Sequence, residues 1–443
     1  MPGQKKEQVF VTPLGGVYET ADTSFLYEAI DNNGKTYSFL MDLGGNPAPT
    51  SDQTEHEARK RFLRIPNARN INDIVITHPH FDHLGGVPLV ARESGAMVHL
   101  SEDALLFLEL MAKKQGVKME EIKTHTFQDG EPFDIGPVHL IPRQCTHSVI
   151  GSFGFDISVF DKTITHMSDN KLTGMTEETR ETNLDQLRKV QDVDLLVTDV
   201  LYARHKGISE PEGPVVLSLF DLIRQKPEKE VTHYVFMNSA NIDRMLNLWK
   251  LLYGADINVS FEGWAMHSTA HILEKRLQRK NSEYKLKMVE VDDPKTHVVF
   301  GTGNQAEEGS FIHRLVKSED LRPGDRLYLS SSLIPNENKA FFQAKVQVMR
   351  ELLTEAVNQG AEVFVHQGQA NVLGLHPTWN VSEAKLHVKS HGLGGDLKLI
   401  AEAKRPKRLL PYHFLNNSVG ELQHLLGDRT RIVKPIMGQR IEI

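Results

Sequence analysis

Short apolar runs that stop at polar or glycine-rich turns dominate the first half of the chain. Residues 8–11 run into a Pro-Leu-Gly-Gly turn at 13–16, and residues 37–41 run into Asp-Leu-Gly-Gly at 42–45. Glycine ends a strand readily because it adopts turn conformations that other residues avoid. The pattern predicts helices at 87–94 and 101–115, with Ser101 as the N-cap of the second. Further strands are predicted at 138–141, 154–158, 163–166 and 195–198.

From about residue 204 the pattern changes, and helices alternate with buried strands. The predicted helices are 215–224, 242–252, 339–359 and 395–403. The predicted strands are 231–236, 297–300, 326–329, 362–365, 385–388 and 408–411. Alternation at this spacing is typical of a parallel α/β unit. The 443 residues suffice for two or three domains, or for one domain with a large insertion.

Composition limits where the protein acts and what it binds. A single cysteine, Cys145, excludes an internal disulfide framework and fits a reducing cytoplasm. No apolar run approaches the roughly 20 residues of a membrane span, so we expect a cytoplasmic protein without a membrane partner. The net charge of −7 argues against a cationic nucleic-acid binder. A nucleic-acid role would require a local basic groove, or metal ions that supply positive charge.

The candidate chemistry is concentrated in residues 78–83, which read His-Pro-His-Phe-Asp-His directly after the apolar residues 74–77. Four metal-binding side chains occupy six positions at the exit of a predicted strand. Imidazole and carboxylate donors suit zinc or manganese. Two such ions can hold both oxygens of a phosphodiester displacement. The alternative is a polar loop whose histidines cap backbone groups. That interpretation suits a single histidine better than it suits this motif.

One turn cannot hold two metal ions alone, so other segments must contribute ligands. His147 and Asp169 follow predicted strands, as does His413 near the C-terminus. Asp42 ends another strand and could orient a histidine. Taken singly, each of these residues is more often structural, because aspartate at a strand end commonly caps a turn.

Other motifs in the sequence are weaker evidence for a binding site. Residues 301–306 fit the GxGxxG/A pattern of dinucleotide sites, but the next strand does not end in an acidic residue. Residues 390–395 precede a helix whose N-terminus could bind an anion. The basic run 275–280 reads as a solvated helix face. The basic run 404–408 has a better claim to nucleic acid, since it lies close in sequence to His391 and His413.

These residues, in this order, resemble the metallo-β-lactamase superfamily, and within it the β-CASP nucleases, most closely ribonuclease J. The resemblance runs from Pro13 to about His424. Motifs typical of the β-CASP branch follow the shared hydrolase motifs and point to nucleic acid; they are Asp199, 241–244, 301–305, 331–335, His391 and 411–413.

The resemblance implies an α/β fold in which residues 1–203 and 375–443 form an αββα metallo-β-lactamase sandwich. A β-CASP α/β domain, residues 204–374, is inserted between them, with the substrate in the cleft. The chain is expected to lack the C-terminal domain typical of ribonuclease J. The implied activity is two-metal hydrolysis of RNA phosphodiester bonds, as a 5′→3′ exonuclease, an endonuclease or both.

The implied metal site holds two Zn²⁺ or Mn²⁺ ions in two groups of ligands that share one carboxylate. The ligands are His78, His80 and His147 on one ion, Asp82, His83 and His413 on the other, and Asp169 between them. The expected catalytic residues are Asp82, Asp169 and His391. Behind the ligands, Asp42 is expected to steer an imidazole, together with Asp199. Contacts to the scissile phosphate, the RNA backbone or a 5′-phosphate are expected from His391, Ser331, Ser332 and Ser390.

The chain departs from the family at several motif positions. Ser168 and Ser390 stand where the family has glycine, residues 200–202 replace Ser-Thr-Asn, and residues 414–415 replace Gly-Glu. These departures indicate a divergent branch whose 5′-end recognition and oligomer contacts differ. Single-stranded DNA is an alternative substrate, because recognition of the 2′-hydroxyl cannot be read from sequence. A small-molecule metallo-hydrolase and a non-catalytic RNA-binding or scaffold protein also remain open, and a homodimer is possible by analogy.

Overall fold

The chain folds into two compact units in the computed structural model. The structure describes residues 6–45, 71–176, 178–225, 231–280, 282, 296–303, 305–333, 339–374, 376–382, 385–415 and 418–443. Unit 1 comprises Met1–Ser209 and Ser390–Ile443, and unit 2 is the intervening Glu210–Lys389. The second boundary lies later than the expected residue 374, because residues 380–382 pair with a strand of unit 2.

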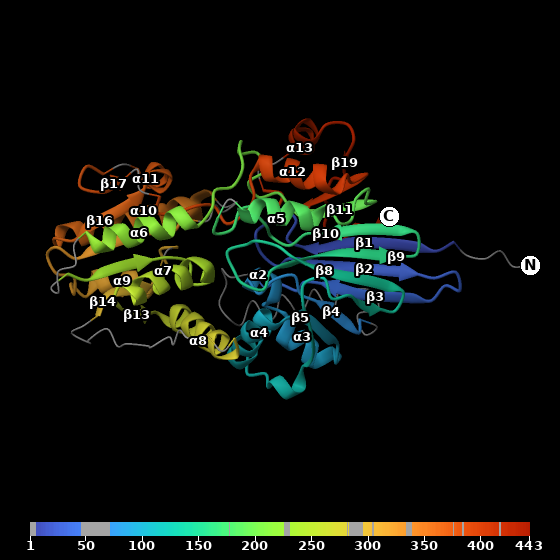
Figure 1. Ribbon diagram of the computed structural model, residues 1–443, viewed down its shortest axis with the longest axis horizontal. Helices are drawn as coiled ribbons and strands as arrows, with labels where there is room; N and C mark the ends of the chain where they lie inside the picture. The colour runs from blue at the N-terminus through green and yellow to red at the C-terminus, as the bar shows by residue number, and fades with distance from the viewer. Residues whose placement is uncertain are drawn as a thin grey trace, which may run out of the picture. The chain divides into compact units, whose positions relative to one another are not determined.

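Two seven-stranded sheets form the body of unit 1 (Figure 1). The first has the order β20 (Ile441–Glu442), β1 (Gln8–Gly15), β2 (Ser24–Ile30), β3 (Thr36–Met41), β4 (Asp73–Val75), β5 (Met97–Ser101) and β6 (Lys123–Phe127). The second has the order β19 (Arg431–Ile432), β18 (Arg408–Tyr412), β11 (Leu195–Asp199), β10 (Lys162–His166), β9 (Phe153–Val159), β8 (Val138–Gln144) and β7 (Phe133–Ile135).

The core of unit 1 lies between these sheets. Phe25 and Phe39 of the first sheet pack in one cluster with Phe155 of the second, and all three are buried. Figure 1 shows helices on both outer sides. They are α3 (Val87–Ser94) and α4 (Glu102–Lys114) beside the first sheet, and α5 (Glu178–Leu187), α12 (Gly394–Lys404) and α13 (Val419–Leu426) beside the second. This arrangement confirms the predicted αββα sandwich.

The N-cap predicted for α4 is formed. Ser101 Oγ accepts a hydrogen bond from the backbone N–H of Ala104, and the same hydroxyl donates to the carbonyl of Gly151. We expect Ser101→Ala to lower the free energy of unfolding by about 1 kcal/mol, because the substitution leaves a helix N–H without its acceptor. Urea denaturation would measure this change. The exposed Ser158 of β9 provides the control, since Ser158→Ala should change stability by less than about 0.5 kcal/mol. An equal effect of both substitutions would contradict the assignment.

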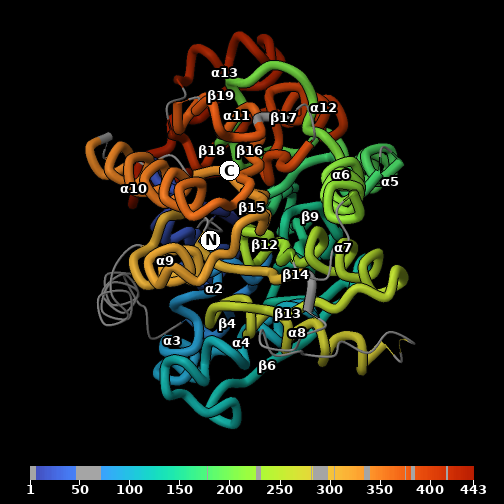
Figure 2. Tube along the Cα trace, turned by 90° about the vertical axis from the view of Figure 1, so that its left-hand side faces the viewer, coloured from blue at the N-terminus to red at the C-terminus, as the bar shows by residue number. Residues whose placement is uncertain are grey.

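Unit 2 contains a six-stranded sheet whose neighbouring strands are all parallel. Its order is β13 (Asn258–Glu262), β14 (Thr296–Gly301), β12 (His233–Phe236), β15 (Arg326–Leu329), β16 (Glu362–His366) and β17 (Asn380–Ser382). Its helices are α6 (Gly213–Arg224), α7 (Ile242–Gly254), α8 (Trp264–Arg279), α9 (Phe311–Lys317), α10 (Lys339–Asn358) and α11 (Gln367–Leu373). In Figure 2, α9 and α10 lie on one side of the strands and α6 and α7 on the other. The predicted parallel α/β unit is therefore confirmed.

The predicted strand at 385–388 is wrong. Residues 385–389 are irregular, and β17 supplies the edge strand instead. The alternation of apolar residues that suggested a strand does correspond to burial, because Leu386 and Val388 are buried. The carbonyl of Leu386, however, accepts a hydrogen bond from the hydroxyl of Ser330 rather than from a neighbouring strand. In the part of the chain that the structure describes, no helix is both long and apolar enough to cross a membrane.

Candidate metal centre

The candidate ligands follow strands that end at a common edge in each sheet. In the second sheet β10, β11 and β18 are parallel neighbours, and β8 runs in the same direction because β9 is antiparallel to both β8 and β10. In the first sheet β3 and β4 are parallel. The carboxyl ends of parallel strands meet at one edge. Residues that follow these strands are therefore close in space, although they come from distant parts of the sequence: Asp42, 78–83, His147, Asp169, Asp199 and His413.

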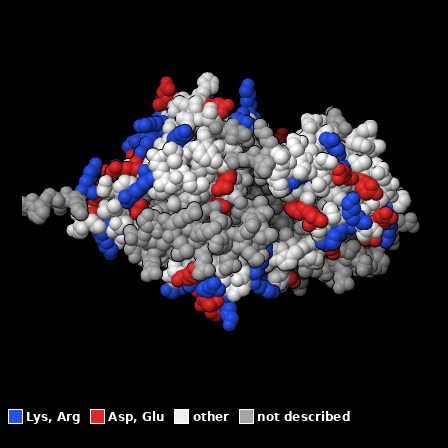
Figure 3. Space-filling view, turned by 180° about the vertical axis from the view of Figure 1, so that it is seen from behind, with Lys and Arg blue, Asp and Glu red and all other residues white. Residues whose placement is uncertain are grey.

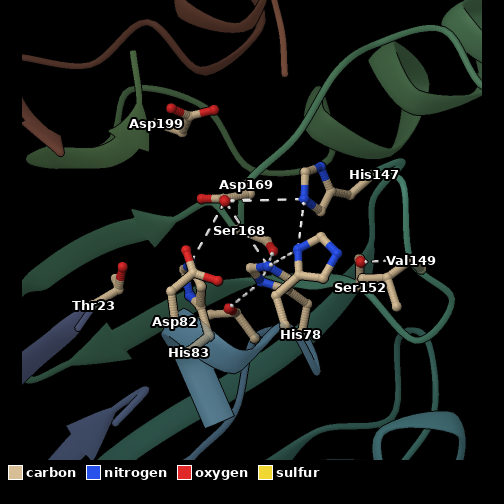
Figure 4. Close-up of polar contacts among 12 residues, drawn as sticks. Thr23, His78, Asp82, His83, His147, Val149, Ser152, Ser168, Asp169 and Asp199 are labelled. Carbon is tan, nitrogen blue, oxygen red and sulfur yellow. Dashed lines mark hydrogen bonds and ion pairs between the residues drawn. The ribbon is translucent and has the colours of Figure 1, made fainter. Parts of the chain in front are cut away.

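Three imidazole nitrogens form the first group. His80 Nδ1 lies 3.1 Å from His78 Nε2 and 3.0 Å from His147 Nε2. Donor atoms on one tetrahedral zinc ion lie about 3.3 Å apart, because each bond is roughly 2.0–2.1 Å long. Asp169 Oδ2 is 3.9 Å from both His78 Nε2 and His147 Nε2. Figure 4 shows His78 and His147 pointing toward Asp169.

The protonation state of these rings suits metal binding. His147 Nδ1 donates to the carbonyl of Ser390 at 3.0 Å, which leaves a lone pair on Nε2. Burial, reinforced by the neighbouring imidazoles, lowers the pKa of His147 and His78 well below the usual value. Burial also lowers the pKa of His80 to about 4. The three rings are therefore neutral at neutral pH, which is the form of histidine that binds metals.

A second group shares Asp169 with the first. His83 Nε2 lies 3.5 Å from Asp169 Oδ2 and 3.6 Å from Asp82 Oδ2, and His413 Nε2 lies 3.9 Å from Asp82 Oδ2. Burial alone would lower the pKa of His83, but Asp169, Asp42 and Asp82 raise it well above its usual value. Burial likewise opposes ionisation of Asp169, while His413 and other imidazoles hold the pKa of that carboxyl well below its usual value. The site therefore stabilises both the ionised carboxylate of Asp169 and positive charge next to it.

Buried polar atoms without partners provide a test of whether these residues fit metal ions. Among the described residues, His83 Nε2, Asp169 Oδ1 and His413 Nδ1 have no hydrogen-bond partner. A buried polar atom without a partner usually costs about 1–3 kcal/mol. Three such atoms within two overlapping groups are explained if cations bind there. The residues present thus fit two divalent ions, with Asp169 common to both groups.

Neighbouring polar groups hold the ligands in place. Asp42 Oδ2 accepts from His83 Nδ1 at 2.7 Å, so that His83 Nε2 faces Asp169. The same carboxylate accepts from the backbone N–H and the hydroxyl of Thr77, each at 2.7 Å. Asp42 and His413 both adopt positive φ angles, of 60° and 48°. Such backbone strain is concentrated at functional sites, where the surrounding structure maintains it.

A third group includes two residues that the sequence analysis assigned to other roles. His391 Nδ1 lies 2.7 Å from Asp199 Oδ2 and 3.8 Å from Asp169 Oδ2, and His413 Nδ1 lies 3.7 Å from Asp199 Oδ1. Asp199, expected only behind the ligands, thus belongs to a group of candidate ligand atoms that shares Asp169 and His413 with the second group. Burial would lower the pKa of His391, but the carboxylates of Asp199, Asp169 and Asp82 together raise this pKa to about 9.

Two hydroxyls that no sequence motif marks also support the candidate ligands. Thr23 Oγ1 lies 3.1 Å from His413 Nε2. Ser168 Oγ lies 3.0 Å from His78 Nδ1, so the serine that replaces the family's glycine contacts a candidate ligand. The glycine pair at 44–45 is the sequence feature that marks this close approach. A Cβ at Gly44 would overlap the backbone carbonyl of Asp82. Only glycine therefore allows the turn after β3 to approach the ligand turn this closely.

The expected substrate contacts are divided between the two units. Ser390 lies in unit 1, and its carbonyl accepts from His147. Ser331 and Ser332 follow β15 in unit 2, where Ser332 Oγ lies 3.1 Å from His387 Nε2. Of the motifs at 301–305 and 331–335, Asn304, Ile334 and Pro335 lie outside the described residues.

Three cations of the basic run 404–408 are paired with carboxylates of unit 1. Lys404 is buried, and its Nζ lies 2.6 Å from Asp156 Oδ1. Arg405 and Lys407 pair with Asp192 and Asp194, at 2.6 and 2.7 Å. These charges are therefore balanced within unit 1. On the described part of the face in Figure 3, basic and acidic side chains are interspersed.

Comparison with known proteins supports the fold and the family resemblance. Residues 46–219 match the family described as "Beta-lactamase superfamily domain". Ribonuclease J of Corynebacterium glutamicum is 25% identical over 373 residues, which cover 81% of this chain and 46% of that protein. Ribonuclease J of Mycolicibacterium smegmatis is 24% identical over 424 residues, which cover 91% of this chain and 68% of that protein. The chain thus spans about half the length of the first relative.

A solved structure has the same fold along nearly the whole chain. It is described as a protein of unknown function from Enterococcus faecalis V583, and it superimposes with a TM-score of 0.65. The match covers 98% of this chain and 100% of the other, at 15% sequence identity. At this identity the likeness concerns the fold alone, and it extends across both the sandwich and the inserted α/β unit.

Proposed function

We propose that this chain, a protein of the metallo-β-lactamase fold related to ribonuclease J, is a metal-dependent ribonuclease that hydrolyses RNA phosphodiester bonds. The observation that carries the proposal is the convergence of two groups of side chains on Asp169. One group contains His78, His80 and His147, and the other contains Asp82, His83 and His413. The sequence relationship to ribonuclease J favours RNA among the possible phosphodiesters.

The proposed ligands of the two ions are His78, His80 and His147 in one group, Asp82, His83 and His413 in the other, and Asp169 in both. When bound there, two divalent ions would supply an activated water and positive charge for the phosphate oxygens. Zn²⁺ fits the histidine-rich group, and Mn²⁺ also fits the group with more oxygen donors. The ions also offset the chain's net charge of −7, which would otherwise repel RNA.

His391 is the proposed donor to the scissile phosphate. Asp199 accepts from its Nδ1 at 2.7 Å, and the carboxylates of Asp199, Asp169 and Asp82 together raise the pKa of the ring to about 9, against the effect of burial. In the imidazolium form, which these carboxylates favour, Nε2 carries a proton as well as Nδ1. That proton can be donated to a phosphate oxygen on which negative charge develops during the reaction. The Asp199 carboxylate fixes the orientation of the ring through the opposite nitrogen.

We expect His391→Gln to lower kcat for RNA cleavage by about 10²–10³-fold, the usual effect of removing one donor to a developing oxyanion. The amide of glutamine is neutral and cannot reproduce the charge-assisted bond. Initial rates at saturating RNA would measure this loss, and the bound metal would be counted in the same preparations. His424→Gln is the matched control, because His424 is exposed on α13. Unchanged kcat in His391→Gln with normal metal content would refute this role.

Incubation of the metal-loaded chain with 5′-labelled RNA and with DNA of the same sequence tests the proposed function directly. Cleavage of RNA that stops when a chelator is added is the expected result. Release of mononucleotides from the 5′ end would identify a 5′→3′ exonuclease, and internal fragments would identify an endonuclease. Cleavage of DNA alone would replace the proposal with a DNA-directed nuclease. Failure to cleave either polymer, with metal bound, would reject it.

A further inference from the structure

A second group of ionisable side chains lies in the first sheet of unit 1, outside the metal centre. Asp73, His99 and His125 belong to the neighbouring parallel strands β4, β5 and β6. His99 pairs in register with His125, so both side chains emerge on the same face of the sheet. His99 also pairs with Val75, which places Asp73 diagonally beside it. The pairing of the strands thus brings two imidazoles and one carboxylate together.

The contacts within this group orient one histidine toward the other. His99 Nε2 lies 2.8 Å from Asp73 Oδ1 and donates to it, because a carboxylate can only accept. The Nδ1 of His99 therefore carries a lone pair, and it lies 3.1 Å from Nδ1 of His125. The ring of Phe133 stacks on His99 with a centroid distance of 4.9 Å and an interplanar angle of 6°. The stacked ring and the carboxylate together fix the orientation of His99.

We propose that Nδ1 of His99 and Nδ1 of His125 form a second type of metal site, for one borderline divalent ion such as Zn²⁺, with Asp73 as the positioning residue. A carboxylate bonded to the far nitrogen of a histidine is the usual support of a metal-binding imidazole. The 3.1 Å separation is close to the spacing of two nitrogens on one ion. His99 is buried and His125 is exposed, so water can complete the coordination shell from the open side.

The electrostatic surroundings support binding of a cation. Burial and the neighbouring His99 lower the pKa of His125, which favours the neutral ring that binds metals. The carboxylate of Glu131 acts in the opposite direction on this pKa and adds negative charge beside the ring. A bound ion would join β5 to β6, the last strand at this edge of the sheet. It would therefore stabilise an edge that otherwise depends on one neighbouring strand.

Equilibrium dialysis of the full chain against buffered Zn²⁺ tests the site. The wild-type protein should retain one more equivalent of Zn²⁺ than His125→Gln. The metal centre around Asp169 is intact in both proteins and should bind the same amount of Zn²⁺ in each. The matched control is His139→Gln, which removes a half-buried histidine of β8 whose Nδ1 contacts the Asp134 carboxylate. That variant should retain as much Zn²⁺ as the wild type. Equal Zn²⁺ content in all three proteins would overturn the proposal and leave a plain N–H···N hydrogen bond.

Substitution of the positioning residue gives a second, independent measurement. Asp73→Asn preserves the size of the side chain but weakens the support of His99, and it should lower the Zn²⁺ affinity of this site by about 10–100-fold. A purely structural role for Asp73 would leave the affinity unchanged, and that result would remove Asp73 from the proposal. RNA cleavage by His125→Gln should equal that of the wild type, so failure of this site and failure of the proposed ribonuclease activity are distinguishable.

Discussion

His80→Ala should reduce metal-dependent RNA cleavage by more than about 10³-fold while the protein remains folded. His80 Nδ1 lies 3.1 Å from His78 Nε2 and 3.0 Å from His147 Nε2, so its removal opens the three-nitrogen group. The loss should exceed that for a single hydrogen-bond donor, because a bound cation is affected as well. Cleavage rates of 5′-labelled RNA, with metal content measured in the same samples, provide the test.

The fold should survive this substitution because His80 is only partly buried and lies in a turn. Circular dichroism and the melting temperature of the variant would check this. His139→Ala is a suitable control, since it also removes a half-buried imidazole from unit 1 but lies outside the groups of candidate ligands. It should cleave RNA at the wild-type rate. Turnover by His80→Ala after its metal has been stripped would show that the assignment of the ligands is mistaken.

Arg244→Ala should lower the stability of unit 2 by about 3–5 kcal/mol, the usual cost of removing one partner from a buried ion pair. Arg244 is 1% exposed, and its Nε and Nη2 donate to Glu212 Oε2 at 3.0 and 2.8 Å. Its Nη1 also donates to the carbonyl and the hydroxyl of Ser330. The substitution would leave the buried Glu212 carboxylate without this guanidinium. Urea denaturation monitored by the fluorescence of Trp249, which is buried in α7, would measure the loss.

Two further variants separate charge burial from lost packing. Replacing both partners, as in Arg244→Met with Glu212→Leu, should cost less than Arg244→Ala, because no uncompensated charge remains in the interior. Arg188→Ala provides the exposed comparison. Its ion pair with Asp185 is largely solvated, so the change should stay within about 0.5 kcal/mol. If Arg244→Ala were as mild as Arg188→Ala, the buried pair would contribute far less than its geometry indicates.

The architecture was predictable because the segments whose sequence pattern favours a strand or a helix form that same element in the folded chain. The run before His78 and the run before Asp169 both read as buried strands, and both are strands in the structure. The helix that begins at Ser101 was marked by its cap and by acidic residues in the first turn. The predicted strand at 385–388 failed because alternation reports burial, and the hydrogen-bond partner of Leu386 is a side chain that lies 56 residues earlier.

The ligand types were readable from sequence, but the contacts that hold them were not. Thr23 and His413 are 390 residues apart, and nothing near Thr23 marks it as a neighbour of His413. Ser168 was noticed as a departure from the family, yet its contact with His78 depends on how β4 and β10 are arranged in separate sheets. Positions at strand ends can thus be predicted, whereas the partners of each side chain follow from the packing of the two sheets.

The most direct test measures bound divalent ions and RNA cleavage in the same titration. Metal-free protein is titrated with Mn²⁺ or Zn²⁺, and each sample is assayed on 5′-labelled RNA. If the ligands grouped around Asp169 hold two ions, cleavage should be absent without metal and should rise as these two equivalents bind. The Zn²⁺ titration is repeated with His125→Gln, so that any ion on the His99 site is not counted. Cleavage by the metal-free protein, or failure to bind any ion at the Asp169 groups, would contradict the account.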